Sequence, residues 1–229
     1  MIIAIHQPNF IPWIGYFFKI SRCDVFVLLD NVQYTKNGFI NRNRIKTPQG
    51  ENWLTLPVIQ SGKFGQDIKD TQIVNKDYTV KKTLASITAN YKKAKYYDKY
   101  FNEFSNVLNT SDDNLCNLNS SIIKWIAADL DIKTKMIYAS ELNGITGEST
   151  ERLVSICKKL NGTDYLAGLG AKKYQEDHLF NSENINVINT PFKHPVYPQL
   201  WKEFLPSMSI MDLLFNCGPE SKIILNNSV

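Results

Sequence analysis

The amino-acid sequence predicts an α/β fold: a mostly parallel, Rossmann-like sheet with an antiparallel β extension and a helical block in the middle. Within residues 1–30 an apolar strand, a helix and a second apolar strand follow one another, the βαβ pattern of a parallel sheet. Residues 31–74 instead show β-type segments separated by turns, and residues 77–131 show helical periodicity. No low-complexity linker interrupts the chain, so we expect a single domain over residues 1–229, with 31–74 as a β-rich insertion and 77–131 as the helical block.

The first elements are short and well marked. Ile2–Ile5 is an apolar run that predicts a buried strand, and Val25–Leu29 predicts a second one. Between them, the two prolines of the His6–Pro12 loop prevent a helix from starting early, and Trp13–Arg22 then follows a helical pattern. Ligands bind at the carboxyl ends of strands in such sheets, which directs attention to the His6–Pro12 loop and to the residues after Leu29.

The β-rich insertion is predicted from two segments around a turn. Phe39–Ile45 and Trp53–Val58 have strand character, and the turn-rich tetrapeptide Thr47–Gly50 joins them. Ile68–Val74 is a candidate third strand.

The rest of the chain predicts helices first and then alternation. The expected elements are helices over Asp77–Lys92, Asp98–Leu108 and Leu115–Leu130, strands over Lys135–Ala139, Asp164–Ala167 and Ile185–Ile188, a helix from Ser149 to Leu160, and a last helix from Ser207 or Ser209 through Phe215. Helices that alternate with strands in this way indicate further units of the same sheet.

Composition excludes several classes of protein. The chain has 229 residues, 43% hydrophobic and 21% charged, which is the ordinary globular range and excludes a disordered, collagen-like or disulfide-scaffold protein. Its four cysteines are scattered without a CxxC spacing, as in reduced buried thiols. No HExxH, Walker loop or four-ligand Cys/His set is present, so we expect no built-in metal site. No apolar run is long enough for a membrane span or a signal peptide, and the predicted location is cytoplasmic.

The loop after the first strand carries the first candidate site residues. His6 directly follows the strand, where it is able to bind phosphate or to act as an acid or base, although a structural role is an equal alternative. Gln7 and Asn9 are neutral hydrogen-bonding groups suited to sugar hydroxyls. Gly15, near the start of the first helix, allows a close backbone approach to an anion.

A second set of candidates follows the second strand. Asp30 ends that strand, where its roles include a base, a metal ligand or a hydroxyl acceptor, with an ordinary turn residue as an equal alternative. Gln33 and Asn41 add amides for substrate contacts.

Three cations follow these candidates. In an extended segment Arg42, Arg44 and Lys46 point to one face, which favours a diphosphate cradle, with a charged edge strand as the alternative.

The charge distribution supports one anion site. Residues 1–99 contain 15 basic and 7 acidic residues, whereas residues 100–229 contain 11 basic and 15 acidic ones. Between Lys19 and Lys46 there are six basic and two acidic residues, next to the His6 loop. This local excess suits a nucleotide phosphate better than a nucleic acid, because the second half is acidic and no nucleic-acid recognition motif is present.

Several motifs in order resemble the WbqC-like family. They are His6-Gln7-Pro8-Asn9-Phe10, Pro12-Trp13 with Gly15-Tyr16, Asp30-Asn31-Val32-Gln33-Tyr34, Asn41-Arg42-Asn43-Arg44-Ile45-Lys46, Trp53-Leu54-Thr55-Leu56-Pro57-Val58, Tyr165-Leu166-Ala167-Gly168 and the tail from Met208 to Asn216. The resemblance spans nearly the whole chain. It implies association with O-antigen and other surface-polysaccharide gene clusters, and transfer of glycine or another acyl group onto an amino sugar.

A weaker resemblance concerns HIGH-type nucleotidyltransferases and pantothenate synthetases. These enzymes bind ATP phosphates with a His-x-Gly-His motif after the first strand. Here Pro12-Trp13-Ile14-Gly15-Tyr16 stands at that place, with the glycine but without the histidines.

The leading expectation is therefore an enzyme that transfers an acyl group to a nucleotide-linked amino sugar, with His6 or Asp30 as the base. An activated acyl donor, or ATP with Mg²⁺, would be its co-reactant. The alternatives are an ATP-dependent ligase or nucleotidyltransferase that activates a carboxylate, and a non-catalytic ligand-binding subunit of a glycan assembly complex.

Overall fold

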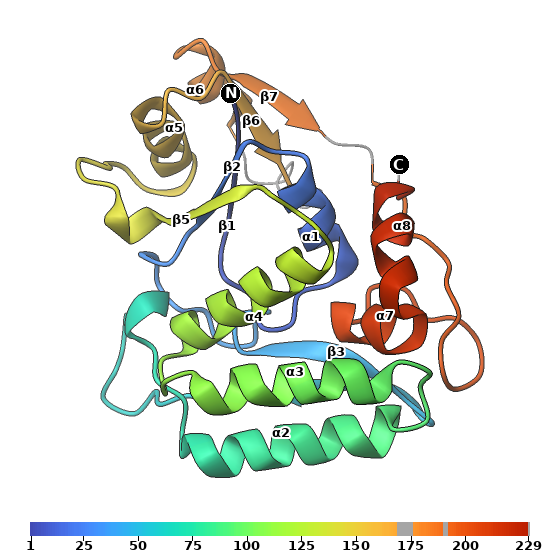
Figure 1. Cartoon of the computed structure of the whole chain (residues 1–229). Helices are drawn as coiled ribbons and strands as arrows, with labels where there is room; N and C mark the ends of the chain where they lie inside the picture. Colours follow the sequence, from blue (N-terminus) through green and yellow to red (C-terminus); the bar gives the residue numbers. More distant parts are fainter. Residues whose placement is uncertain (169–175, 190–191, 229) are drawn as a thin grey trace.

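The computed structural model describes residues 1–168, 176–189 and 192–228 (Figure 1). It confirms the predicted α/β class and the mostly parallel sheet. Five strands form a sheet in the order β5-β2-β1-β6-β7, and all four pairings are parallel. The strands are β1 (Ile2–His6), β2 (Val25–Leu28), β5 (Lys135–Tyr138), β6 (Asp164–Ala167) and β7 (Asn186–Asn189).

Helices cover both faces of this sheet. Ala4 packs on one face in the core that includes α1 (Ile14–Ser21) and α4 (Leu115–Asp129). Ile3 and Ile5 point the other way, into a second core with α5 (Ser149–Lys159) and the short α6 (Asp177–Asn181). Burial on both faces explains why the strands are apolar at almost every position instead of alternating with polar residues.

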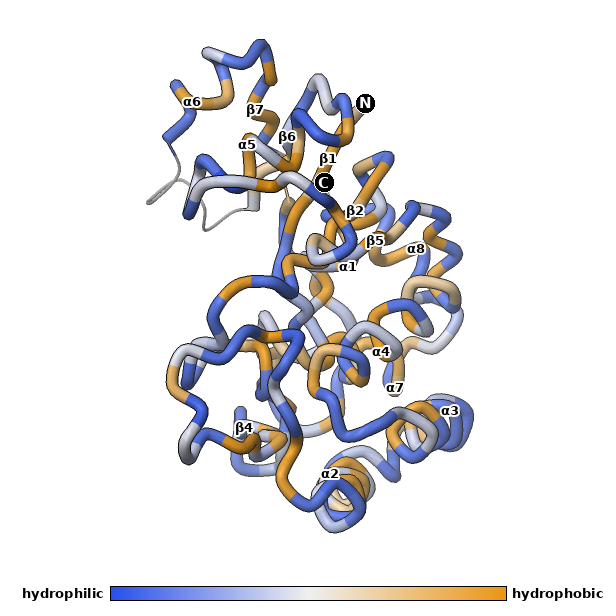
Figure 2. Tube along the Cα trace, turned by 90° about the vertical axis from the view of Figure 1, so that its left-hand side faces the viewer, coloured by the Kyte–Doolittle hydropathy of each residue, from blue (hydrophilic) through white to orange (hydrophobic). Residues whose placement is uncertain are grey.

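The helical block agrees with the predicted one. It consists of α2 (Lys76–Tyr91), α3 (Tyr97–Thr110) and α4, and asparagine side chains cap the first turns of α2 and α4. Figures 1 and 2 both place the sheet with α5 and α6 at one end of the molecule and α2 and α3 at the other, with α4 between them.

The carboxyl-terminal segment forms α7 (Ile210–Cys217) and α8 (Ser221–Asn226). Ser209 caps α7 by accepting a hydrogen bond from the backbone N–H of Met211, so the predicted start of this helix is confirmed. Helices α6 and α8 were not predicted, because at five and six residues they are too short to show a helical period. Three 3₁₀ turns complete the described elements: η1 (Ile68–Asp70), η2 (Ala139–Glu141) and η4 (Gly218–Glu220).

The predicted antiparallel extension is a hairpin of β3 (Arg42–Thr47) and β4 (Gly50–Thr55). The predicted bounds were wrong by about three residues in each strand. Thr47 pairs directly with Gly50, whose φ of 116° permits a tight two-residue turn, so both strands continue up to the turn. The apolar residues that follow Thr55 are buried outside the hairpin and misled the prediction.

The third strand predicted over Ile68–Val74 was wrong. Its backbone bonds go to different neighbours: the Ile68 N–H donates to Val32, and the Ile73 N–H donates to Asp113. Since no single strand runs beside the segment, it forms the 3₁₀ turn η1 and isolated bridges.

Candidate functional site

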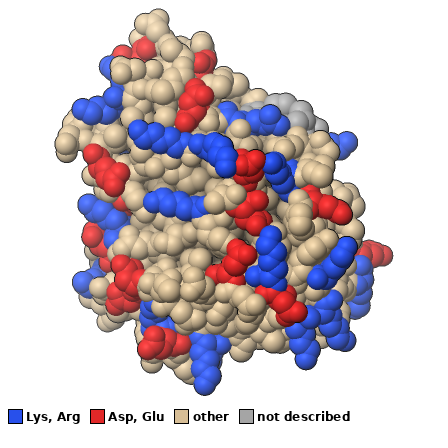
Figure 3. Space-filling model, viewed as in Figure 1, with Lys and Arg blue, Asp and Glu red and all other residues tan. Residues whose placement is uncertain are grey.

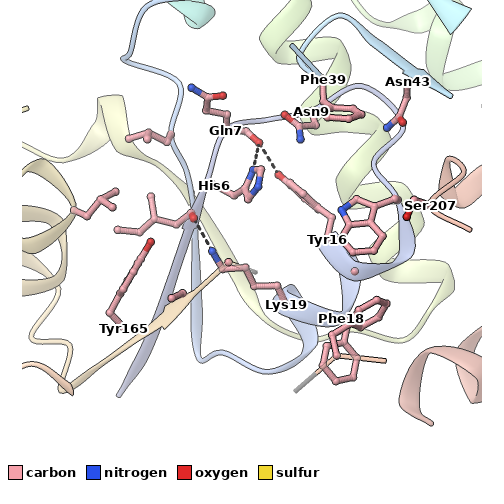
Figure 4. Close-up of a pocket in the computed structure, with 18 of the residues that line it drawn as sticks. His6, Gln7, Asn9, Tyr16, Phe18, Lys19, Phe39, Asn43, Tyr165 and Ser207 are labelled. Atoms are coloured by element: carbon pink, nitrogen blue, oxygen red, sulfur yellow. Dashed lines mark hydrogen bonds between the residues drawn. The ribbon is translucent and has the colours of Figure 1, made fainter. Parts of the chain in front are cut away.

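The order of the strands creates a crevice beside β1. The chain passes from β1 to β2 and β5 on one side, and then crosses to place β6 on the other side of β1. The carboxyl ends of β1 and β6 are therefore the topological switch point, where open α/β sheets bind ligands. A cavity of about 820 Å³ lies there, lined by Ile5 and His6 from the end of β1 and by Tyr165 and Ala167 from β6 (Figure 4).

The cavity combines hydrogen-bonding groups with aromatic walls. Its polar lining comes chiefly from His6, Gln7, Asn9, Lys19, Asn43 and Arg44. Its aromatic lining comes from Trp13, Tyr16, Phe18, Phe39, Tyr165 and Phe192. Such a lining suits a ligand that carries ring faces, hydroxyl groups and negative charge.

Two buried asparagines fix the loop that carries Gln7 and Asn9. Asn119 of α4 donates to the carbonyl oxygens of Pro8 (2.9 Å) and Ile40 (2.7 Å). Asn43 of β3 donates to the carbonyl oxygens of Phe10 and Ile11 at 3.1 and 3.0 Å. The loop is thus tied to α4 and to the hairpin, which gives its side chains defined positions at the cavity.

His6 is held as one neutral tautomer. Its Nδ1 lies 3.0 Å from the Gln7 carbonyl oxygen, which accepts hydrogen bonds only, so Nδ1 carries the proton and Nε2 has the lone pair. The Tyr16 hydroxyl donates to the same oxygen, also at 3.0 Å, and packs edge-on against the imidazole. Burial, and then the charge of Lys19, lower the pKa of His6 to about 4. The imidazole is therefore neutral at pH 7.

Lys19 is a buried cation that the sequence reasoning missed. It lies in the apolar helix α1 with 8% of its surface exposed, and its Nζ donates to the Ile5 carbonyl oxygen at 2.9 Å. Burial lowers its pKa to about 8. Among the described residues it makes no ion pair with a carboxylate. The available signal was a single charged residue inside an apolar helix.

Five of the predicted site residues line the cavity together. They are His6, Gln7, Asn9, Gly15 and Arg44. Tyr16 and Asn43 of the family motifs line it as well, although they were not assigned a role.

Three other predicted residues lie outside the cavity lining. Both carboxylate oxygens of Asp30 accept hydrogen bonds from Ser140, from its N–H at 2.9 Å and its hydroxyl at 2.5 Å. The Asn41 side chain is buried and donates to the Leu56 carbonyl oxygen at 2.8 Å. Gln33 is exposed and forms a single bridge with Asp67.

The three strand cations share a face but not a site. Arg42 donates to the Asn37 carbonyl oxygen at 2.5 Å, and its guanidinium lies 4.2 Å from the centre of the Trp53 ring. Lys46 is 1% exposed, and its Nζ donates to the Gln199 side chain and to the Glu203 carbonyl oxygen.

Of the three, only Arg44 lines the cavity, where it forms an ion pair with Glu51 at 3.0 Å. The cradle expected from their shared face is therefore not assembled at the cavity.

Gly15 serves packing in this structure. A Cβ atom at this position would stand 2.5 Å from the Trp13 indole, so the missing side chain lets the indole lie against the first turn of α1. An aromatic ring therefore covers the first turn of α1 at Gly15.

Three further features bear on the kind of site: metal-ligand groups, membrane-spanning helices and the surface charge. No group of three or more His, Cys, Asp or Glu within the described residues is placed to hold a metal ion. No described helix is long and apolar enough to cross a membrane. On the face drawn in Figure 3, Lys and Arg residues are interspersed with Asp and Glu residues.

Comparisons with known proteins agree with the motifs. The chain is 36% identical over 221 residues to the "Uncharacterized protein Rv1507c" of Mycobacterium tuberculosis (strain ATCC 25618 / H37Rv), covering 96% of this chain and 95% of that protein. No solved structure shows a significant match. The model of the WbqC-like protein family matches residues 7–224, which include the hairpin and the cavity lining from Gln7 onward, while Ile5 and His6 lie just before the matched range. The chain belongs to the WbqC-like protein family.

Proposed function

We propose that this protein is a cytoplasmic enzyme of surface-polysaccharide biosynthesis that transfers a glycyl or other acyl group to the amine of a nucleotide-linked amino sugar. The observation that carries the proposal is the neutral His6, whose Nε2 has no hydrogen-bond partner among the described residues, in a cavity at the switch point of the sheet. The surface-polysaccharide context is supported by what resemblance to the WbqC-like family implies.

In the proposed reaction the sugar amine attacks the carbonyl carbon of an activated acyl donor, such as a thioester. The new C–N bond forms, the bond to the leaving group breaks, and the leaving group departs with the electron pair. Nε2 of His6 accepts the proton that the amine loses. Gln7 and Asn9 bind sugar hydroxyls.

The test is amide formation with purified protein, a panel of nucleotide-linked amino sugars and an aminoacyl or acyl thioester, followed by mass spectrometry. We expect the acylated sugar with wild type and a loss of about 100-fold or more with His6→Ala, in line with the usual contribution of a general base. His178→Ala, which changes an exposed histidine outside the cavity lining, is the matched control and should retain full activity.

Other outcomes would overturn the proposal in distinguishable ways. Pyrophosphate release from ATP in the presence of a carboxylic acid would indicate a ligase or nucleotidyltransferase. Tight binding of a nucleotide sugar with no turnover for any donor would indicate a ligand-binding subunit.

A further inference from the structure

The cation that is available to a ligand differs from those that the sequence indicated. The protein itself engages Lys46 and Arg42, as described above, and Arg44 is paired with Glu51. Lys19 makes one hydrogen bond to protein in the described residues, to the Ile5 carbonyl oxygen, although an ammonium group has three N–H donors. Two donors of this buried positive charge therefore have no acceptor among the described residues, and we take them as the groups that a ligand would bind.

The surroundings of Lys19 leave space beside the ammonium group. A Cβ atom at Gly168, just after β6, would stand 3.8 Å from Nζ of Lys19, and no other atom of the described residues would lie within 4 Å of it. The centre of the Tyr165 ring lies 5.8 Å from Nζ. Figure 4 shows Lys19 reaching toward the end of β1 between the labelled residues His6 and Tyr165.

We propose that Lys19 binds a phosphate group at the switch point of the sheet, namely the diphosphate of a nucleotide-linked substrate. A buried cation without a counter-charge is costly, and an incoming phosphate supplies both the charge and the acceptor oxygens. The identity of the complete ligand rests on the proposed function, whereas binding of phosphate at Lys19 does not. Lys19 is then a substrate-binding residue, and Gly168 is required to leave the space for the phosphate.

The experiment is calorimetric titration of the full chain with inorganic diphosphate. We expect Lys19→Met to weaken binding by about tenfold or more, which corresponds to about 1.4 kcal/mol. Gly168→Val keeps the ammonium group but fills the space beside it, and should weaken binding by several fold. Lys82→Met removes the same charge from the exposed face of α2, so its affinity should stay within twofold of wild type.

Three results would overturn the inference. The first is that wild type does not bind diphosphate. The second is that folded Lys19→Met binds diphosphate with wild-type affinity. The third is that Gly168→Val binds it with wild-type affinity, and this result decides the matter if Lys19→Met does not fold. Acetate is titrated in parallel. If acetate binds in a Lys19-dependent way and diphosphate does not bind, the ligand of Lys19 is a carboxylate and the phosphate inference is wrong. If diphosphate binds through Lys19 but no acyl transfer is found, only the proposed function fails.

Discussion

The Asn119 side chain donates a hydrogen bond to the Pro8 carbonyl oxygen at 2.9 Å, which links helix α4 to the loop of the candidate site. The same amide also donates to Ile40 at 2.7 Å, and Asn119 is fully buried. Replacing it with leucine would leave two buried carbonyl oxygens without these donors. We expect Asn119→Leu to lower the free energy of unfolding by roughly 2–4 kcal/mol, measured by urea denaturation.

The matched control for this prediction lies on the same helix. Asn117 is exposed, so Asn117→Leu should change the free energy of unfolding by less than about 0.5 kcal/mol. Equal effects of the two substitutions would show that the link between α4 and the loop does not contribute to stability.

Asp30 is expected to act on stability rather than on catalysis. Both of its carboxylate oxygens accept hydrogen bonds from Ser140, which joins the end of β2 to η2. Asp30→Asn should lower the free energy of unfolding by roughly 1–3 kcal/mol and leave diphosphate affinity and acyl transfer within about twofold of wild type. A double-mutant cycle with Ser140→Ala should give a coupling energy of similar size. A normally stable Asp30→Asn protein without transfer activity would instead restore the catalytic role predicted from the sequence.

His6 should remain neutral well below its usual titration range. The fold lowers its pKa from 6.5 to about 4, so its contribution to stability is complete above pH 6.5 and is lost as the pH falls toward 4. We expect the His6 ring proton resonances to stay constant from pH 8 to pH 5 in NMR spectra, assigned by their absence in His6→Asn. A midpoint near 6.5 would show that the ring is solvated and that Lys19 does not influence it.

The parts of the fold with strong local signals were predictable. The runs Ile2–Ile5 and Val25–Leu29 have the apolar character of strands buried on both faces, and the structure places both in the parallel sheet. The predicted bounds of the hairpin strands were displaced because apolar residues after Thr55 were read as part of a strand, whereas they pack in the core outside the hairpin. The turn between Thr47 and Gly50 determines where the paired strands meet. Hydrophobicity indicates burial, but it does not tell which backbone groups are paired.

The site was partly predictable for a similar reason. Strand geometry correctly puts Arg42, Arg44 and Lys46 on one face, as the pairing register shows. The environment of each cation depends on distant residues: Gln199, which binds Lys46, lies 153 positions further along the chain. Lys19 was missed because lysine is almost always exposed, and only the packing of α1 against the sheet shows that this one is not.

Asp212 should make the stability of the protein depend on pH in the direction opposite to His6. It is fully buried on α7, and its carboxylate accepts a hydrogen bond from Gln199 at 2.7 Å. Burial raises its pKa from 3.8 to about 6, so the fold favours the protonated form. Its contribution to stability is complete below pH 3.8 and is lost as the pH rises through about 6, by roughly 3 kcal/mol at most.

The measurement is urea denaturation of wild type and Asp212→Asn at pH 4, 5, 6 and 7. The asparagine does not ionise, so the stability of the variant does not fall as the pH rises through 6. The variant is less stable than wild type at pH 4, because its amide adds N–H donors for which the described residues of the buried site offer no matching acceptor. The free energy of unfolding of wild type minus that of the variant should therefore decrease from pH 4 to pH 6. Burial lowers the pKa of both His6 and His194, so these histidines change the stability in the opposite direction. Their contributions are the same in wild type and in the variant, and the difference cancels them. A difference that stays constant over this range would mean that Asp212 is ionised in the folded protein throughout, with the ammonium group of Lys46 as its compensating charge.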